Sequence, residues 1–246
     1  MNEIEDKYSQ FLHNEIITLL KKRKITKFYP PQWKAIKPGL EGKNLVVSIP
    51  TASGKTLIAE IIALQKFLKA PEESKENSKR RKKILYLCPL KALANEKHKE
   101  FKESWKKLGL KVGISTSDID QNDFRVFFND LIILTNEKAD SLIRSNPKLI
   151  QNIQMVICDE IHLINDESRG ITLEFLLTRL ITLNPDIQIV GLSATIKNAN
   201  ELAEWLGAKL ITSDWRPVKL KEGFYSKNKI EFKDGSIRKV LKVSKM

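Results

Sequence analysis

Residues 45–68 constrain the fold more than any other stretch of the chain. An apolar, β-branched run over Leu45–Ile49 stops at Pro50, and a helical pattern covers Leu57–Leu68. Between them lies a short turn of small residues that ends in Gly-Lys-Thr at positions 54–56. This order predicts a strand, a loop and a helix.

A loop of this kind is suited to binding phosphate. Its backbone N–H groups and the start of the following helix attract anions, so we expect it to bind a nucleotide. Lys55 would reach the β- and γ-phosphates, and the Thr56 hydroxyl would bind Mg²⁺. Ile49 stands where the usual phosphate-loop pattern has glycine, and a plain strand-to-helix turn that needs Gly54 is the alternative. The expected nucleotide contacts in the loop are Pro50, Thr51, Ala52, Ser53, Gly54, Lys55 and Thr56.

Two adjacent carboxylates follow another apolar run. Residues 155–158 predict a buried strand, and Asp159 and Glu160 come directly after it. Carboxylates in such a place are costly unless they meet a cation or solvent. Because Lys55 is expected at the end of another strand, a bound Mg²⁺ would explain why two carboxylates lie here. Asp159 would hold the metal and Glu160 would orient and deprotonate the attacking water, so these three residues form the candidate catalytic set. His162 would sense the nucleotide state through a neighbouring loop, or is a satisfied structural histidine.

A glutamine stands at a predicted helix start shortly before the phosphate loop. Pro30 and Pro31 exclude a helix until about Gln32, and Phe28 and Tyr29 precede them. A side-chain amide offers both the donor and the acceptor that the N6/N7 edge of adenine needs. Gln32, with Phe28 nearby, is therefore a candidate adenine contact. Alternatively, Gln32 caps the helix while both aromatic rings pack on the core.

Further polar side chains fall where other buried strands are expected to end. Lys91 and Lys97 follow one of these strands, at the edge where ligands of open α/β sheets bind. Thr135 follows the next strand and also suits a helix N-cap. Ser193 and Thr195 follow the last long strand, and their hydroxyls would bridge the carboxylates to a second surface.

The order of elements predicts the fold class. Strands alternate with helices along residues 1–215, which indicates an α/β domain with a mostly parallel sheet flanked by helices. After this point the pattern changes. Residues 218–225 and 229–232 are expected to be antiparallel strands, with a turn at 233–236. We therefore expect a second region, residues 216–246, that forms a short β-hairpin extension.

The amino-terminal residues are expected to form a single helix. Residues 1–24 begin polar and then continue with a helical spacing of apolar positions. These positions are Ile4, Tyr8, Phe11, Leu12, Ile16 and Leu19.

The composition of the chain indicates which kinds of partner it binds. The net charge is +13 and the pI is near 9.6, which favours a polyanionic partner. Residues 216–246 hold ten Lys/Arg against three Asp/Glu, so this region either faces nucleic acid or is a solvated end. Cys88 and Cys158 each end an apolar run and indicate reduced core thiols of a cytoplasmic protein. No apolar run reaches the roughly 18 residues of a membrane span, so no membrane partner is expected.

Together these stretches resemble the first motor domain of a superfamily 2 helicase. The likeness is greatest to the Ski-like group and, within it, to the archaeal Hjm family of DNA-repair helicases. The resemblance to that family in particular rests on residues 159–170 and 191–217. The matching motifs are the Q motif (28–32), motif I (50–56), motif Ia (89–97), motif Ib (135–144), motif II (159–162) and motif III (193–195).

The resemblance implies a RecA-like fold, ATP and Mg²⁺ as cofactors, and a 3′-to-5′ motor. Its track would be single-stranded or forked DNA during repair or replication-fork processing. In the family, motifs Ia and Ib grip the backbone of the tracked strand, and motifs II and III couple hydrolysis to movement. The residues carried over as nucleic-acid contacts are Pro89, Lys91, Lys97, Thr135 and Lys138. Those carried over as coupling residues are His162, Ser193 and Thr195.

Helicases of this kind bind ATP between two RecA-like domains. The second domain supplies arginines that stabilise the transferring phosphoryl group. Nothing after residue 219 has the length of such a domain, so residues 216–246 are interpreted as the start of a linker toward it. Full activity is expected to require that second domain.

Two alternative functions stay open at the level of sequence. The chain could be the motor domain of an RNA helicase of the same group, because no motif reads the 2′-OH or a base. By itself it could also be a nucleotide- and nucleic-acid-binding module without significant turnover.

Overall fold

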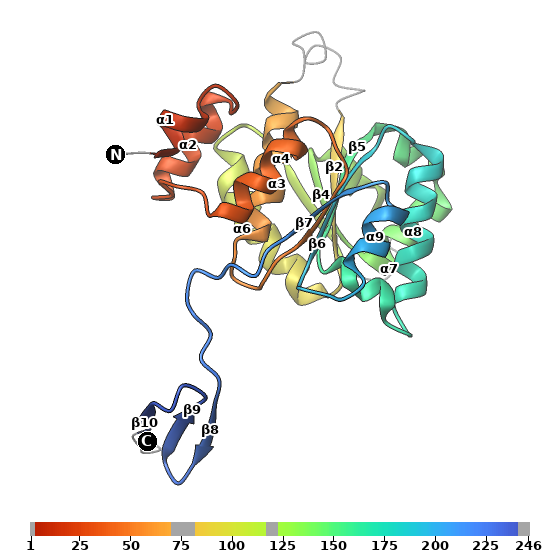
Figure 1. The fold of residues 1–246 in the computed structure, drawn as a ribbon. Helices are drawn as coiled ribbons and strands as arrows, with labels where there is room; N and C mark the ends of the chain where they lie inside the picture. The colour runs from red at the N-terminus through yellow and green to blue at the C-terminus, as the bar shows by residue number, and fades with distance from the viewer. Residues whose placement is uncertain (1–2, 70–81, 117–122, 241–246) are drawn as a thin grey trace, which may run out of the picture. The chain divides into compact units, whose positions relative to one another are not determined.

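The computed structural model describes residues 3–69, 82–116 and 123–240 (Figure 1). Contacts divide the chain into two compact units, residues 1–215 and residues 216–246. The first unit is a sheet between two layers of helices, and the second is a small separate sheet. No helix among the described residues is long and apolar enough to cross a membrane.

The sheet of the first unit has seven strands, and every pairing between them is parallel. This confirms the predicted fold class. The strands are β1 (Leu45–Ser48), β2 (Lys83–Cys88), β3 (Val112–Ser115), β4 (Leu131–Thr135), β5 (Ile153–Cys158), β6 (Gln188–Ser193) and β7 (Lys209–Thr212), in the spatial order β3-β4-β2-β5-β6-β1-β7. The central strands are buried throughout, as their unbroken apolar sequences require.

Helices cover both faces of this sheet (Figure 1). One face carries α1 (Glu3–Tyr8), α2 (Asn14–Lys22), α3 (Pro30–Leu40), α4 (Lys55–Leu68) and α6 (Lys91–Lys106). The other carries α7 (Asn136–Ser145), α8 (Gly170–Leu183) and α9 (Ala199–Trp205). Short 3₁₀ turns complete the unit: η2 (Asp123–Phe128), η3 (Pro147–Asn152) and η4 (Ile161–Asn165). Each helical layer shares one apolar core with the sheet.

The amino-terminal segment forms two helices, so the prediction of a single helix was wrong. The chain leaves α1 after Tyr8 and begins α2 after His13, whose side chain accepts from Glu15 N. Gln65 of α4 satisfies the backbone between the helices: it accepts from His13 N (2.9 Å) and donates to Phe11 O (3.0 Å). A tertiary contact therefore replaces the helical hydrogen bonds that the local pattern alone would favour.

The second unit is a three-stranded antiparallel sheet of β8 (Gly223–Ser226), β9 (Lys229–Phe232) and β10 (Ile237–Lys239). The predicted hairpin is present, but β8 begins later than the predicted strand and β10 adds a third strand. Lys227 and Asn228 join β8 to β9 with φ angles of 46° and 61°, as a two-residue hairpin turn requires.

We predict that the contribution of Lys66 to stability rises with pH. Its ammonium donates to Gln188 Oε1 (2.7 Å), and burial, helped by the charge of Lys82, lowers its pKa to about 8 from 10.5. Between these values this side chain holds its proton more often in the unfolded chain than in the folded chain, so its contribution to the free energy of unfolding should increase with pH. The buried thiols of Cys88 and Cys158 act in the opposite direction, because burial raises their pKa in the folded chain. The effect is therefore measured as the difference in the free energy of unfolding between the wild type and Lys66→Gln, by urea unfolding between about pH 7.5 and about pH 10. This difference should shift in favour of the wild type as pH rises; a constant difference would contradict the prediction.

Candidate nucleotide-binding site

The phosphate loop follows β1, as the sequence predicts. Ile49 and Pro50 continue the buried strand, and α4 begins at Lys55. Ala52 and Gly54 have φ angles of 65° and 77°, so the chain reverses through two left-handed residues before the helix starts. The start of α4 thus presents free backbone N–H groups at the edge of the sheet.

Lys55 lies folded back against this loop. Its ammonium donates to Ile49 O at 3.1 Å. Burial lowers the pKa of Lys55, while the negative charges of Glu160 and Asp159 partly oppose that shift. The cation therefore lies in the field of both motif II carboxylates and has one backbone partner, so an anionic phosphate would improve its environment.

Asp159 is held rigidly at the end of β5. Its backbone N–H donates to Leu87 O, the Tyr86 hydroxyl donates to Oδ2 (2.8 Å), and Glu160 N donates to Oδ1 (3.1 Å). The residue is only 6% exposed. Burial, and then the charge of Asp159, raises the pKa of Tyr86 well above its usual value, so this phenol remains a donor. The sequence analysis did not identify Tyr86, although a tyrosine in an otherwise apolar strand signals a buried partner for its hydroxyl.

The sheet brings the phosphate loop and the carboxylates to one edge. β6 alone lies between β1 and β5, with Ser48 paired to Ser193 and Cys158 to Gly191. Because neighbouring strands lie about 4.8 Å apart, the two strand ends are separated by about 10 Å. Residues that are far apart in the sequence therefore face one site.

The donor set fits Mg²⁺. Carboxylate and hydroxyl oxygens are its usual protein ligands, and each oxygen of Asp159 keeps a lone pair beyond its hydrogen bond. Within the described residues, no cluster of three His, Cys, Asp or Glu could hold a metal by itself. A cation here would take Asp159, Thr56 and ligands from phosphate or water, as Mg²⁺ commonly does.

The candidate coupling residues lie close to the site but are not joined to one another. His162 Nδ1 lies 3.3 Å from Glu160 Oε2 but makes no hydrogen bond with it. Ser193 is buried and donates to Ala194 O, which also accepts from Ser48. Thr195 is exposed. Within the described residues, neither motif III hydroxyl bonds to Asp159 or Glu160.

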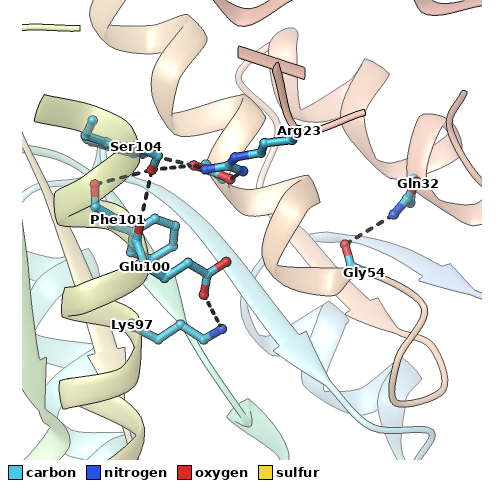
Figure 2. A network of polar contacts seen from close by, with 9 residues as sticks. Arg23, Gln32, Gly54, Lys97, Glu100, Phe101 and Ser104 are labelled. Carbon is cyan, nitrogen blue, oxygen red and sulfur yellow. Dashed lines mark hydrogen bonds and ion pairs between the residues drawn. The ribbon is translucent and has the colours of Figure 1, made fainter. Parts of the chain in front are cut away.

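Gln32 contacts the phosphate loop directly (Figure 2). Its Oε1 accepts from Tyr29 N (2.8 Å), and its Nε2 donates to Ser53 O (3.2 Å) and Gly54 O (3.5 Å). The helix-capping alternative is therefore present, and the same amide also braces the loop. Adenine could bond to Gln32 only if it displaced some of these contacts.

Aromatic residues surround the Q motif. Phe28 stacks on Trp33 at 5.9 Å and meets Tyr8 at 5.2 Å, so it packs with the amino-terminal helices. Trp215, which the sequence analysis did not single out, lies 4.4 Å from the Tyr29 ring, and its carbonyl accepts from the Ser53 hydroxyl. The end of the first unit thus closes over the phosphate loop.

A cavity of about 560 Å³ lies beside the loop, between α4 and α6. Gly54, Thr56 and Leu57 form the wall nearest the loop, and Ile25 lies on the amino-terminal side. This volume lies in the range of small-molecule sites. Gln32 does not line this cavity.

The five candidate nucleic-acid contacts differ in exposure. The Lys91 side chain is exposed at the start of α6. Lys97 is buried and pairs with Glu100 at 2.9 Å. Thr135 caps α7 by accepting from Lys138 N (3.3 Å), and the side chains of both residues are buried, as is Pro89.

The chain is similar to known helicases. The model of the DEAD/DEAH box helicase family matches residues 29–202. The ATP-dependent DNA helicase Hel308 of Pyrococcus horikoshii is 48% identical over 229 residues, which are 93% of this chain and 30% of the relative. The Hel308 of Methanocaldococcus jannaschii is 47% identical over 229 residues, covering 92% of this chain and 18% of the relative. The chain therefore spans less than a third of the length of these relatives.

A solved structure shares the fold. The crystal structure of the DUF1998 helicase MrfA, bound to DNA and AMPPNP, superposes with a TM-score of 0.70 at 25% identity. The likeness covers 83% of this chain and 29% of the MrfA chain.

The contact between Gln32 and the loop predicts a large effect of Gly54→Ala. A Cβ at Gly54 would lie 2.2 Å from Gln32 Nε2, whereas Gly42, with φ of +84°, has no atom within 4 Å of its Cβ position. Both substitutions incur the left-handed strain of about 1–2 kcal/mol, but Gly54→Ala must also displace Gln32. Urea unfolding should show the greater loss of stability for Gly54→Ala.

Adding Gln32→Ala separates the two causes. Gln32→Ala should lower the free energy of unfolding less in the Gly54→Ala background than in the wild type, because in that background it also removes the clash. Equal losses for Gly42→Ala and Gly54→Ala, or strict additivity of the pair, would contradict this account of the loop.

Proposed function

Because this chain belongs to the DEAD/DEAH box helicase family, we propose that it is the ATP-binding motor domain of a DNA helicase. The observation that carries the proposal is the meeting of the Lys55 loop and the Asp159–Glu160 pair at one edge of a parallel sheet. The motor would hydrolyse ATP with Mg²⁺ and move 3′ to 5′ on single-stranded or forked DNA. Its role would lie in repair or replication-fork processing.

The catalytic roles follow from the chemistry of each group. Lys55 leaves Ile49 O and binds the β- and γ-phosphates. Thr56 and Asp159 would hold Mg²⁺, which would supply positive charge against the phosphates. Glu160, more exposed than Asp159, accepts a proton from the attacking water.

The base would lie on the Q-motif side of the loop, where Gln32 contacts Ser53 and Gly54, and not in the α4–α6 cavity, which Gln32 does not line. Gln32 would contribute by exchanging its contacts with the loop for adenine, with Phe28 packed behind it. His162, Ser193 and Thr195 would couple hydrolysis to movement, through contacts that form when a second domain closes.

A DNA track is favoured over an RNA track by the relatives. The Hel308 proteins are named ATP-dependent DNA helicases, and the MrfA structure holds DNA. Lys91 would contact phosphate with its side chain. At α7, where Thr135 and Lys138 are buried, the backbone N–H groups of the helix start would make the contact.

Full turnover would require a second RecA-like domain that supplies arginines to the phosphates. Residues 216–246 would lead toward it. The first test is Mg-ATP binding and hydrolysis by the 246-residue chain, with and without single-stranded DNA. Binding without turnover supports a motor domain that awaits its partner domain, whereas no binding contradicts the proposal.

Lys55→Ala should weaken Mg-ATP binding. Loss of charged hydrogen bonds of about 1.5–3 kcal/mol corresponds to about a 10- to 100-fold increase in Kd. Titration with a fluorescent ATP analogue measures this. Lys37→Ala is the matched control, since it removes an exposed lysine of α3 away from the loop. Unchanged binding by Lys55→Ala would refute its assigned role.

Lys91→Ala should reduce the salt dependence of DNA binding. Loss of one phosphate contact lowers the slope of log Kd against log salt concentration by about 1. Fluorescence anisotropy with a labelled single strand at several salt concentrations gives this slope. Lys106→Ala removes the same charge from the opposite end of α6 and should leave the slope unaltered. A common slope for both variants would exclude Lys91 from the interface.

A further inference from the structure

A buried carboxylate lies at the junction of three helices. Glu60 is on α4, little more than one turn after Lys55, and is only 2% exposed. A buried charge is costly unless it is paired and its lone pairs are satisfied. Four donors surround this one: Arg23 Nη1 (2.6 Å), Arg23 Nη2 (2.8 Å), Trp105 Nε1 (3.2 Å) and Ser104 Oγ (3.3 Å).

The donors come from two other helices. Arg23 caps the end of α2 and makes a bidentate pair with Glu60. Burial opposes the charge of Arg23, but the hydrogen bonds and charge of Glu60 raise its pKa overall. Ser104 and Trp105 belong to α6. Figure 2 shows Arg23 and Ser104 converging on this point from opposite sides.

Glu60 links two helices that each begin with a proposed ligand contact. α4 begins with the phosphate-binding residues Lys55 and Thr56, and α6 begins with Lys91. In the described part of the chain, both hydrogen bonds between α4 and α6 end on Glu60. The two helices also meet through apolar side chains, among them the rings of Phe67 and Trp105. A movement of the first turn of α4 would therefore reach α6 through this carboxylate.

We propose that Glu60 is a positioning residue that couples nucleotide binding at the phosphate loop to the nucleic-acid grip of α6. The inference rests on the proposed function, because it needs both ligands to bind. It assigns to Glu60 no contact with the reacting atoms. Its effect passes through Ser104 and Trp105 to the helix that carries Lys91.

A matched control exists on the same helix. Gln65 is also buried on α4 and makes two hydrogen bonds, but its partners are His13 N and Phe11 O in the amino-terminal segment. Gln65→Leu should destabilise the fold without touching α6. It therefore separates a loss of stability from a loss of coupling.

The coupling is measured as the ratio of two dissociation constants for DNA, one without nucleotide and one with nucleotide bound. The Kd of a labelled single-stranded DNA oligonucleotide is determined for the 246-residue chain with and without Mg-AMPPNP. In the wild type we expect the nucleotide to change this Kd by about 5-fold or more, in the range of typical couplings. Glu60→Gln should bring the ratio to less than about 2, whereas Gln65→Leu should keep the wild-type ratio.

Hydrogen exchange gives a second readout. Nucleotide binding to the wild type should alter amide exchange both in the loop at 50–56 and in α6. In Glu60→Gln the change should be confined to the loop. If Glu60→Gln does not fold, the double variant Ser104→Ala and Trp105→Phe leaves the Arg23–Glu60 pair intact and removes both hydrogen bonds from α6 to Glu60.

The outcomes distinguish this inference from the proposed function. If the wild type binds no nucleotide, the proposed function fails and the inference fails with it. If it binds both ligands without mutual effect and without a response in α6, the proposed function stands and the inference is wrong. The inference is also wrong if Glu60→Gln keeps the wild-type ratio or if Gln65→Leu loses it.

Discussion

The parallel direction of all seven strands is the constraint on which the rest of the structure depends. A parallel sheet needs a crossover after each strand, and these crossovers leave every carboxyl strand end at one edge. Five different strands end at or shortly before Lys55, Lys91, Thr135, Asp159 and Ser193, and these residues reach that edge for this one reason. The placement of β1 between β6 and β7 then makes the phosphate loop a neighbour of the carboxylates.

The charges at this edge are held in place before any ligand arrives. Lys55 has a backbone carbonyl as its partner, and Asp159 is fixed by a phenol and a backbone N–H. Burial lowers the pKa of Lys55, which means that its charge is incompletely stabilised by the protein itself. A phosphate would supply the missing counter-charge, and the rigid Asp159 would limit the reorganisation needed when a metal binds.

The sequence predicted the sheet and the meeting of the loop with the carboxylates at one edge, because both depend on local signals. Apolar β-branched runs mark the strands, and Gly54-Lys55 marks the loop. The break between α1 and α2 escaped prediction because it depends on Gln65, more than fifty residues away. Gln32 was ambiguous for a different reason, because a glutamine at this position suits both an adenine contact and a helix cap. Its hydrogen bonds to the loop arise from tertiary packing, which the local sequence does not show. The support of Asp159 by Tyr86 likewise depends on strand pairing.

The anchoring of α4 reflects a conflict between stability and movement. A helix that binds phosphate at its first turn gains from rigid support, yet a motor must pass displacement from that turn to its track. Both buried polar anchors, Glu60 and Gln65, lie beyond the first turn, whereas the residues that would touch phosphate are bonded to the loop itself, to Gln32 and to Trp215. Of the two anchors, Glu60 alone reaches the helix that begins with Lys91. Displacement of the first turn would thus be passed to the proposed nucleic-acid helix through the hydrogen bonds that Ser104 and Trp105 donate to Glu60.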